Sequence, residues 1–360
     1  MGRVTLQTIA DQLGVSRMTV SNAFSRPDQL SSELRDRILS TAHELGYVGP
    51  DPTARALARG TAGAVGVLLT DSLRLAFTDQ VATEFLGGVV QELGPTGRAL
   101  TLLTTGTRDG VEPARDVAID GALIYSCDVA SPAREWLLRR KLPVVFVDQD
   151  PVPGITSVNV DDRSGARAAA QHLVDLGHRR IGILNATVDG PAGIVDDPLG
   201  AATAHPQRQR MLGWLDALDA AGISPIVAQA SGGAVDDSRE AAAALLATKP
   251  RPTAVLCFSD VFALGVLRLA RVLKLDVPAD LSVIGFDDTP AARTSEPALT
   301  TVRQDVAAKG RLAATALNAA IDHASSGSPA KVRHHVLPTE LVVRETTARP
   351  RSPRAKRPSP

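Results

Sequence analysis

Residues 4–24 have the sequence VTLQTIADQLGVSRMTVSNAF, which predicts two short helices joined by a tight turn. In the first helix, apolar residues recur at the spacing of one helical face: Leu6, Ile9, Ala10 and Leu13. Thr5 stands just before this face as a candidate N-cap. Gly14 follows it, where the helix must end and a left-handed backbone favours glycine. The stretch therefore begins with a short amphipathic helix that ends abruptly.

The second helix is expected to begin after Ser16, a residue type that favours N-caps. Its inner face is apolar: Val20, Ala23 and Phe24. Its outer face carries side chains of the kinds that contact base edges and phosphates: Arg17, Met18, Ser21 and Asn22. The pattern predicts a helix-turn-helix unit whose second helix enters the major groove of DNA. An ordinary helical hairpin within a core is the alternative interpretation.

Length and composition limit the class of protein. The 360 residues are 44% hydrophobic, enough for more than one buried core. No apolar run approaches the roughly 18–20 residues of a membrane-spanning helix. The first residues lack the apolar segment of a secretory signal, so we expect a cytoplasmic protein. Cys127 and Cys257 lie in apolar strand-like runs, which predicts buried reduced thiols and no metal site.

The charge of the N-terminal segment is low for a DNA-binding domain. Residues 1–60 contain seven arginines and six acidic residues, a local charge of +1. Because bulk electrostatics then contributes little affinity, specific binding needs base contacts, a groove insertion and two copies acting together. The low charge therefore favours an obligate dimer over a monomeric DNA clamp.

The segment after the helix pair predicts a third helix and a short linker helix. Residues 32–46 (SELRDRILSTAHELG) repeat apolar residues at helical spacing, with Ser31 or Ser32 as the cap. Residues 51–60 (DPTARALARG) have Asp and Pro at their start and Gly at their end, as short helices do. So short a helix is marginal in water, and we expect it to need DNA and a partner chain.

From residue 62, apolar runs alternate with amphipathic helices. Strands are expected at 64–69, 99–103, 122–125, 144–147, 181–184, 226–228, 254–258 and 283–284. Helices are expected between several of them, at 163–176, 210–221, 238–247 and 261–273. The fold class is an all-α helix-turn-helix head followed by α/β, with two doubly wound parallel-sheet lobes. A ligand would bind between the lobes, beyond the carboxyl ends of the strands.

Short motifs continue along the chain in a fixed order. The N-terminal motifs are VTL (4–6), GVS (14–16), TVS (19–21), LGY (45–47) and ARAL (54–57). Later motifs include LPVVFVD (142–148), GHRRI (177–181), RMLGW (210–214), SDVFALG (259–265), LSVIGFDD (281–288) and LTTVRQD (299–305). The set spans residues 3–345 and closely resembles the lactose-repressor/galactose-repressor (LacI/GalR) family of transcriptional regulators.

The resemblance implies four parts. They are a DNA-binding domain at 1–48, a hinge helix at 49–61, a two-lobed effector and dimerisation domain of periplasmic-binding-protein type at 62–345, and a disordered basic tail at 346–360. The expected N-lobe comprises 62–161 and 291–324, and the expected C-lobe comprises 162–290 and 325–345. Asp287 and Asp288 are expected in a turn that orients a crossover between the lobes.

The resemblance also implies a homodimer on a pseudopalindromic double-stranded DNA operator. Three residues match its base-reading positions: Arg17, Met18 and Asn22. Four more would serve phosphates: Thr5, Ser16, Thr19 and Ser21. In the hinge, Ala54 and Arg55 accompany Leu57, which matches the leucine that wedges into the minor groove. The alternative is that Leu57 packs against its twin or the core lobe.

Five residues match or lie near the family's effector contacts: Phe77, Asp79, Asp148, Arg210 and Asp260. Carboxylates and a guanidinium suit vicinal hydroxyls, so a sugar-like or nucleoside-like effector is expected. The alternatives are a core role for Phe77, a surface ion pair for Arg210 and a helix N-cap for Asp260.

The sequence predicts a transcriptional regulator, acting as a repressor, rather than an enzyme. A sugar- or nucleoside-acting enzyme using the same cleft is the alternative, but the placed residues include no positioned acid–base pair or nucleophile. A solute-binding transport component is disfavoured by the DNA-binding head. No cofactor, metal or membrane partner is expected.

Overall fold

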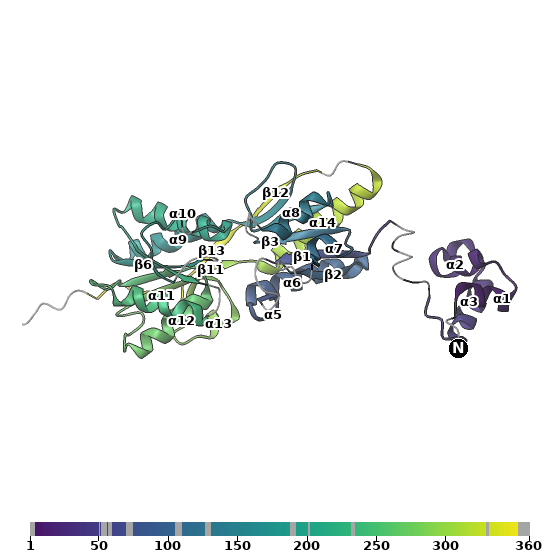
Figure 1. Cartoon of the computed structure of the whole chain (residues 1–360). Helices are drawn as coiled ribbons and strands as arrows, with labels where there is room; N and C mark the ends of the chain where they lie inside the picture. The colour runs from purple at the N-terminus through teal and green to yellow at the C-terminus, as the bar shows by residue number, and fades with distance from the viewer. Residues whose placement is uncertain are drawn as a thin grey trace, which may run out of the picture. The chain divides into compact units, whose positions relative to one another are not determined.

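The computed structural model describes residues 4–49, 51, 56, 60–69, 75–104, 110–126, 131–187, 192–200, 202–231, 235–328 and 331–351. The chain divides into two compact units, Met1–Gly63 and Ala64–Pro360 (Figure 1). The first unit is the head. The second consists of two lobes, each built on one β-sheet with helices on both faces, as the sequence predicts.

The head contains the expected three helices. They are α1 (Leu6–Leu13), α2 (Arg17–Ser25) and α3 (Ser32–Glu44), with a short 3-10 helix, η1, at Pro27–Gln29. Thr5, Ser16 and Ser31 cap the three helices, each accepting a hydrogen bond from a backbone N–H in the first turn. Gly14 ends α1 with φ 67°, so the predicted left-handed stop is confirmed. One apolar core joins all three helices, with Ile9, Val20 and Ile38 fully buried.

The N-lobe is built on a six-stranded sheet with the order β12-β5-β4-β3-β1-β2. Its strands are β1 (Ala64–Leu69), β2 (Ala99–Leu103), β3 (Gly121–Tyr125), β4 (Val144–Val147), β5 (Thr156–Val160) and β12 (His334–Leu337), all parallel to their neighbours. Its helices are α5 (Leu75–Thr78), α6 (Gln80–Leu93), η2 (Gly94–Thr96), α7 (Pro113–Asp116), α8 (Pro132–Arg139) and α14 (Val306–Ser326). Successive strand residues point to opposite faces of this sheet. One face packs against α6 and α14 and the other against α7 and α8, so both faces are buried.

The C-lobe is built on a seven-stranded sheet with the order β13-β11-β10-β9-β6-β8-β7. Its strands are β6 (Ile181–Thr187), β7 (Gly193–Ile194), β8 (Ile226–Ser231), β9 (Ala254–Cys257), β10 (Ser282–Asp287), β11 (Thr300–Gln304) and β13 (Thr339–Val342). Its helices are α9 (Asp162–Asp175), α10 (His205–Ala220), α11 (Val235–Ala247), α12 (Asp260–Val272) and α13 (Pro290–Thr294). Only β7 and β13, at the two edges, pair antiparallel.

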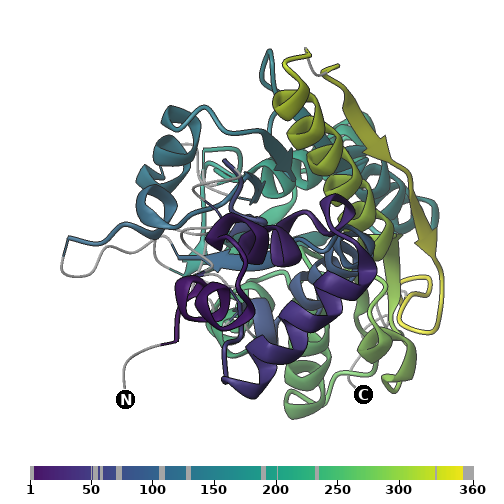
Figure 2. The same ribbon diagram turned by 90° about the vertical axis from the view of Figure 1, so that its right-hand side faces the viewer.

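The chain crosses between the lobes three times, and two of the crossings differ from the expected boundaries. The first lies between β5 and α9, as expected, but the second follows β11 at Gln304 rather than residue 290. The third lies between β12 and β13, at Pro338 rather than residue 324. Figure 2 shows β12 and β13 as successive yellow-green arrows. The expected crossover at Asp287 is therefore wrong, because β10 and β11 pair within one sheet.

The expectation of disorder from residue 346 is wrong for residues 346–351. Thr346 is fully buried, and its hydroxyl donates to the Val283 carbonyl at 2.6 Å. His178 binds the Ala348 carbonyl through Nε2 at 2.9 Å. Composition did not reveal this because the segment is held by contacts with β10 and the loop after α9, not by its own apolar residues. Residues 352–360 lie outside the described part of the chain.

Helices α6 and α14 cross at two facing glycines. A Cβ on Gly88 would lie 2.3 Å from the Ala307 carbonyl oxygen, and one on Gly310 would lie 2.3 Å from that of Phe85. Such distances are far below van der Waals contact, so the two backbones approach this closely only because neither glycine has a side chain. The close approach at this crossing sets the position of the first turns of α14 against α6 in the N-lobe.

We expect Gly88→Ala to destabilise the protein by about 2 kcal/mol, because the helices must separate to admit the methyl group. Gly87→Ala is the matched control. A Cβ at Gly87 meets nothing within 4 Å, so this substitution should be neutral or stabilising by roughly 0.5–1 kcal/mol. Chemical denaturation followed by circular dichroism measures both, and equal stability of the two variants would contradict the packing argument.

Candidate functional site

Helix α2 presents the predicted base-reading residues away from the head core. Met18 is 69% exposed, although it is a large apolar residue, and Arg17 beside it is also exposed. Asn22 is half-buried, and its Nδ2 donates to Gln29 Oε1 at 3.2 Å, which orients its amide. Ser21 is half-buried on the same helix. The outward face of α2 therefore combines a guanidinium, an amide and a thioether.

Three of the four predicted phosphate-contacting residues, Thr5, Ser16 and Thr19, lie at two helix N-termini. The Thr5 hydroxyl accepts from Thr8 N at 3.3 Å at the start of α1. The Ser16 hydroxyl accepts from Thr19 N at 3.0 Å and contacts the Thr19 hydroxyl at 2.8 Å at the start of α2. Helix N-termini favour phosphate because their N–H groups and dipole are positive. The hinge residues Ala54, Arg55 and Leu57 lie outside the described residues.

Where the two lobes meet, six polar side chains form a continuous series of contacts, here termed the interlobe cluster: Asp148, Asp162, Arg210, Asp287, Gln304 and Lys309. Its N-lobe part is a buried ion pair. Lys309 Nζ, in the first turn of α14, lies 2.5 Å from Asp148 Oδ2, just after β4. The ammonium also donates to Gln304 Oε1 at 3.2 Å, across the second crossing.

The C-lobe part continues from Gln304. Its Nε2 donates to Asp287 Oδ1 at 2.7 Å, and Arg210 Nη2 lies 3.6 Å from the same oxygen. Arg210 Nε donates to Asp162 Oδ1 at 2.7 Å. The guanidinium also lies 3.6 Å from the Phe286 ring centroid, a cation–π contact. Arg210 is therefore a buried member of the cluster, and the alternative of a surface ion pair is wrong.

Burial controls the ionisation of the cluster. It raises the pKa of Asp287 to about 8, against the opposing effect of Arg210. It also raises the pKa of Asp162. Burial alone would lower the pKa of Arg210, but Asp162 and Asp287 raise it. At neutral pH the Asp287 carboxyl is therefore mostly protonated, while the guanidinium keeps its charge.

Two carboxylate oxygens of the cluster are buried without a hydrogen-bond partner among the described residues. They are Asp148 Oδ1 and Asp162 Oδ2. A buried acceptor without a donor costs free energy, and such atoms are uncommon in native proteins. Each of these two oxygens can accept a hydrogen bond from a hydroxyl donor.

Among the other predicted effector contacts, Asp260 and Asp79 are not members of the interlobe cluster, although both help to raise the pKa of Asp287. Asp260 is fully buried, and its two oxygens accept from Thr301 Oγ1 at 2.5 Å, Thr289 N at 2.7 Å and Thr289 Oγ1 at 3.0 Å. Burial raises the pKa of Asp260 to about 6. The N-cap of α12 is Ser259 rather than Asp260. The Asp260 carboxylate therefore ties α12 to β11 and the turn after β10.

Two predicted effector contacts lie before α6. Asp79 caps this helix by accepting from Ala82 N at 2.7 Å, and burial raises the pKa of Asp79. Phe77 is 72% exposed, so the alternative of a core role for it is wrong.

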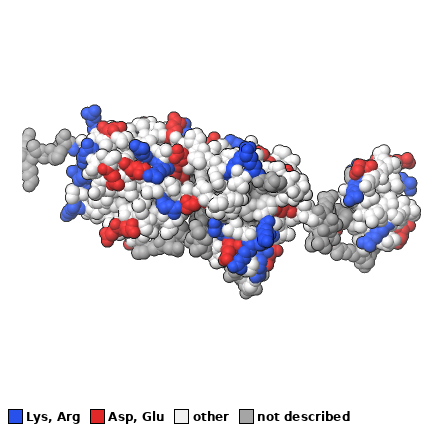
Figure 3. All heavy atoms as spheres, turned by 90° about the horizontal axis from the view of Figure 1, so that it is seen from above, with Lys and Arg blue, Asp and Glu red and all other residues white. Residues whose placement is uncertain are grey.

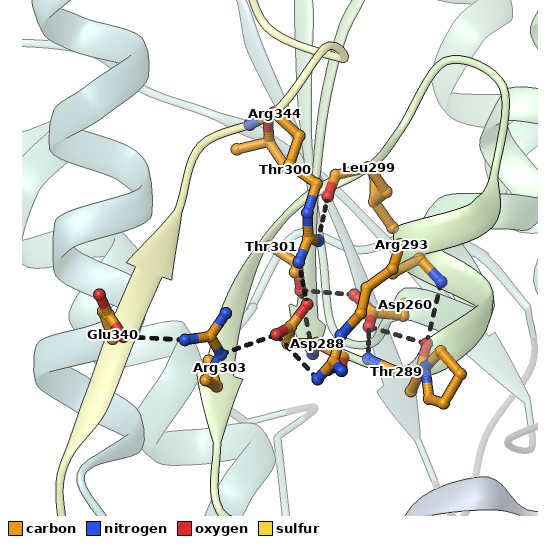
Figure 4. A network of polar contacts seen from close by, with 12 residues as sticks. Asp260, Asp288, Thr289, Arg293, Leu299, Thr300, Thr301, Arg303, Glu340 and Arg344 are labelled. Carbon is orange, nitrogen blue, oxygen red and sulfur yellow. Dashed lines mark hydrogen bonds and ion pairs between the residues drawn. The ribbon is translucent and has the colours of Figure 1, made fainter.

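Asp288 holds the turn that presents Asp287. Figure 4 shows arginines from three segments pointing at its carboxylate. Arg303 Nε donates to Asp288 Oδ2 at 2.7 Å, Arg293 Nη2 donates to the same oxygen at 3.1 Å, and Arg344 binds Oδ1. Both aspartates have positive φ, 116° and 57°, which side chains disfavour. The arginines over-determine this turn and so hold Asp287 beside Gln304.

A second contact between the lobes lies nearby. His205 Nδ1, at the start of α10, is 2.8 Å from Asp150 Oδ1, and Arg208 binds the other oxygen. The Arg208 and His205 contacts lower the pKa of Asp150 although burial raises it.

Sequence reasoning missed four members of the cluster: Asp162, Asp287, Gln304 and Lys309. The sequence pattern around Lys309 could have identified it as a buried, paired residue. It stands among the apolar and small residues of the buried face of α14, between Val306 and Ala313, where a charged side chain needs a partner. Asp287 was interpreted as a turn residue, because the residues that surround it in the sequence do not show that Gln304 and Arg210 contact it in the fold.

Comparison with known proteins identifies the chain. The profile of bacterial regulatory proteins of the lacI family matches residues 5–49, and a periplasmic binding protein-like domain matches residues 170–347. An HTH-type transcriptional regulator of Mycobacterium tuberculosis is 38% identical over 359 residues, covering 97% of this chain and 98% of the relative. The chain belongs to the LacI family. It is a transcriptional regulator with a DNA-binding domain and a ligand-binding domain.

Other LacI-family proteins share both sequence and fold. The regulator IpsA of Corynebacterium glutamicum is 40% identical over 331 residues, covering 88% of this chain and 91% of the relative. A LacI-family regulator from the same organism has a crystal structure with TM-score 0.71 and 36% identity, covering 97% and 100% of the two chains. The lac repressor dimer bound to operator and an anti-inducer has TM-score 0.76 and 27% identity, covering 96% and 100%. Among the described residues, no helix is long and apolar enough to span a membrane.

The raised pKa of Asp287 predicts a pH dependence of stability. Between pH 3.8 and about 8, the folded state holds a proton that the unfolded chain has released. The contribution of Asp287 therefore makes the folded state less stable as pH rises through this range, by at most about 1.4 kcal/mol per pH unit.

Asp287→Asn mimics the protonated form and removes this contribution. The free energy of unfolding is measured by chemical denaturation without effector. The value for the variant minus the value for the wild type should increase as pH rises toward 8. A difference that stays constant across the range would contradict the assignment.

Proposed function

We propose that this LacI-family regulator is a repressor that binds a pseudopalindromic operator as a homodimer. A small polar effector, sugar-like or nucleoside-like, binds between the lobes and controls the affinity for the operator. The observation that carries the proposal is the interlobe cluster, which combines acceptors suited to hydroxyl groups with a direct contact to the second crossing.

The composition of the α2 face supports specific rather than bulk electrostatic DNA binding. Arg17 suits guanine, Asn22 suits adenine and Met18 suits a thymine methyl group. Figure 3 shows positive and negative side chains interspersed over the visible faces of both units. With so little net charge, base contacts in two half-sites supply the affinity, which requires a dimer. The solved lac repressor was found as a dimer on its operator.

The chemistry of the interlobe cluster supports a hydroxyl-rich effector. Asp148 Oδ1 and Asp162 Oδ2 have no hydrogen-bond partner among the described residues, and carboxylate acceptors bind hydroxyl donors strongly. Arg210 adds a fixed guanidinium between two aromatic rings. A related regulator, CelR, was solved as a cellobiose complex and has TM-score 0.68 and 28% identity, covering 96% of this chain and 100% of CelR.

The position of the cluster supports coupling between the two sites. Lys309 and Gln304 flank the second crossing, so a ligand that shifts Asp148 or Asp287 also acts on this hinge. Lobe movement then changes the geometry of the dimer and its hinge helices. Such a coupling free energy between sites is of the order of 1–3 kcal/mol.

Arg17→Ala tests the recognition helix. We expect it to lower operator affinity by about 1–3 kcal/mol while binding to unrelated duplex changes little, because a base contact is lost. Arg37→Ala, an exposed arginine on α3, removes the same charge elsewhere and should weaken both kinds of binding slightly and equally. Gel-shift titrations measure both, and equal losses of specificity in the two variants would count against the assigned role of α2.

Arg210→Lys tests the effector site. The charge stays, but the two-pronged contact to Asp162 and the Phe258 carbonyl is lost, so effector affinity should fall at least about tenfold while operator binding is retained. Arg163→Lys, which alters a surface ion pair with Asp216, is the matched control. Calorimetry that finds normal effector affinity in Arg210→Lys would exclude this site.

A further inference from the structure

Lys309 is a fully buried charged residue near the start of α14. It lies one turn into α14, which Asp305 caps by accepting from Ala308 N at 2.8 Å, and its side chain is 1% exposed. Lysine is almost never buried to this extent without a partner, because removing an ammonium from water costs several kcal/mol. Its retention in the core therefore requires a specific counter-charge.

The surroundings of the ammonium hold it in one place. Asp148 Oδ2 lies at 2.5 Å, Gln304 Oε1 at 3.2 Å, and the Tyr125 ring centroid at 5.6 Å. Tyr125 in turn stacks on Phe85 with ring centroids 4.5 Å apart. Lys309 is thus a fixed counter-charge on one oxygen of Asp148, while the other oxygen, Oδ1, keeps no partner among the described residues.

Each cationic group of the interlobe cluster is paired with a carboxyl group. Lys309 Nζ lies 2.5 Å from Asp148 Oδ2, and Arg210 Nε donates to Asp162 Oδ1 at 2.7 Å. The third carboxyl, on Asp287, is mostly protonated because burial raises its pKa to about 8. A ligand that brought its own charge into this buried place would have to compete with these ion pairs, and burying an unpaired charge is strongly unfavourable.

We propose that Lys309 determines the charge of the ligand accepted between the lobes: by pairing with one oxygen of Asp148, it leaves the other as a hydroxyl acceptor and excludes ammonium-bearing and phosphorylated ligands. The inference rests on the proposed effector site and names its ligand class as uncharged polyhydroxy compounds. Lys309 acts through Asp148, so it is a positioning residue for specificity. A ligand ammonium would be repelled by Lys309, and a phosphate by the open oxygens of Asp148 and Asp162.

The test uses matched probes with the full-length protein. Glucose, galactose and mannose are each compared with their amino and 6-phosphate derivatives, and adenosine is compared with its 5′-monophosphate. Thermal shift and calorimetry give the affinities. Wild type should bind a neutral member of a set at least about tenfold more tightly than its charged derivatives.

Lys309→Met should reverse this preference. Asp148 then lacks its counter-charge, so affinity for the neutral sugar should fall and that for the corresponding amino sugar should rise, each by about tenfold. A merely structural role would weaken all probes alike. Arg98→Met, which removes the ion pair with Asp322 at the far end of α14, is the matched control and should keep the wild-type profile.

The double variant Asp148→Asn/Lys309→Met provides a folded comparison if Lys309→Met alone is unstable, since it removes both buried charges together. It should still bind the neutral sugar and gain no affinity for the amino sugar. Tighter binding of a charged probe to the wild type, or an unchanged preference in Lys309→Met, would overturn the role of Lys309 but leave the effector site standing. Absence of binding by every probe to the wild type would overturn the proposed sugar or nucleoside effector, and this inference with it.

Discussion

The buried ion pair between Lys309 and Asp148 is the interaction on which the N-lobe half of the interlobe cluster depends. Its two residues are 161 positions apart, one at the start of α14 and one after β4. Two charges can be buried together only when their attraction and hydrogen bonds offset the loss of hydration. The close α6–α14 crossing at Gly88 and Gly310 places α14 so that this geometry is met. Gln304 then extends the polar contacts across the second crossing into the C-lobe.

The same close pairing gives a physical reason for regulation. The free energy of the cluster changes when a ligand supplies donors to Asp148 and Asp162, and these residues lie in different lobes. A ligand shifts a conformational equilibrium only by its differential affinity for the two states. Since Asp148 and Asp162 lie in different lobes, a ligand that binds both acceptors favours the lobe arrangement in which both contact it. The turn at Asp287 and Asp288, held by three arginines, keeps the C-lobe half of the cluster in place.

Local patterns predicted the helices of the head and most of the sheet strands, but not which lobe the last strands of the chain belong to. The cap residues Thr5 and Ser16 and the stop at Gly14 are properties of a few neighbouring residues, and all three were confirmed. The strands β11 and β12 were assigned to the wrong lobes, because an apolar run shows that a strand is buried but not which sheet it joins. Residues 346–351 were mistaken for a free tail because their burial depends on β10.

The sequence by itself determined the family, the helix-turn-helix head and the two α/β lobes, since motifs and periodicity are written in neighbouring residues. The tertiary structure alone decided that the Asp260 carboxylate is hydrogen-bonded within the protein, to Thr289 and Thr301. It also decided that Asp287 is a protonated member of the interlobe cluster and that Lys309 forms an ion pair with Asp148. These depend on burial and on distances between residues far apart in the chain. Such distances follow from the order of strands and the points of crossing, which no local pattern contains.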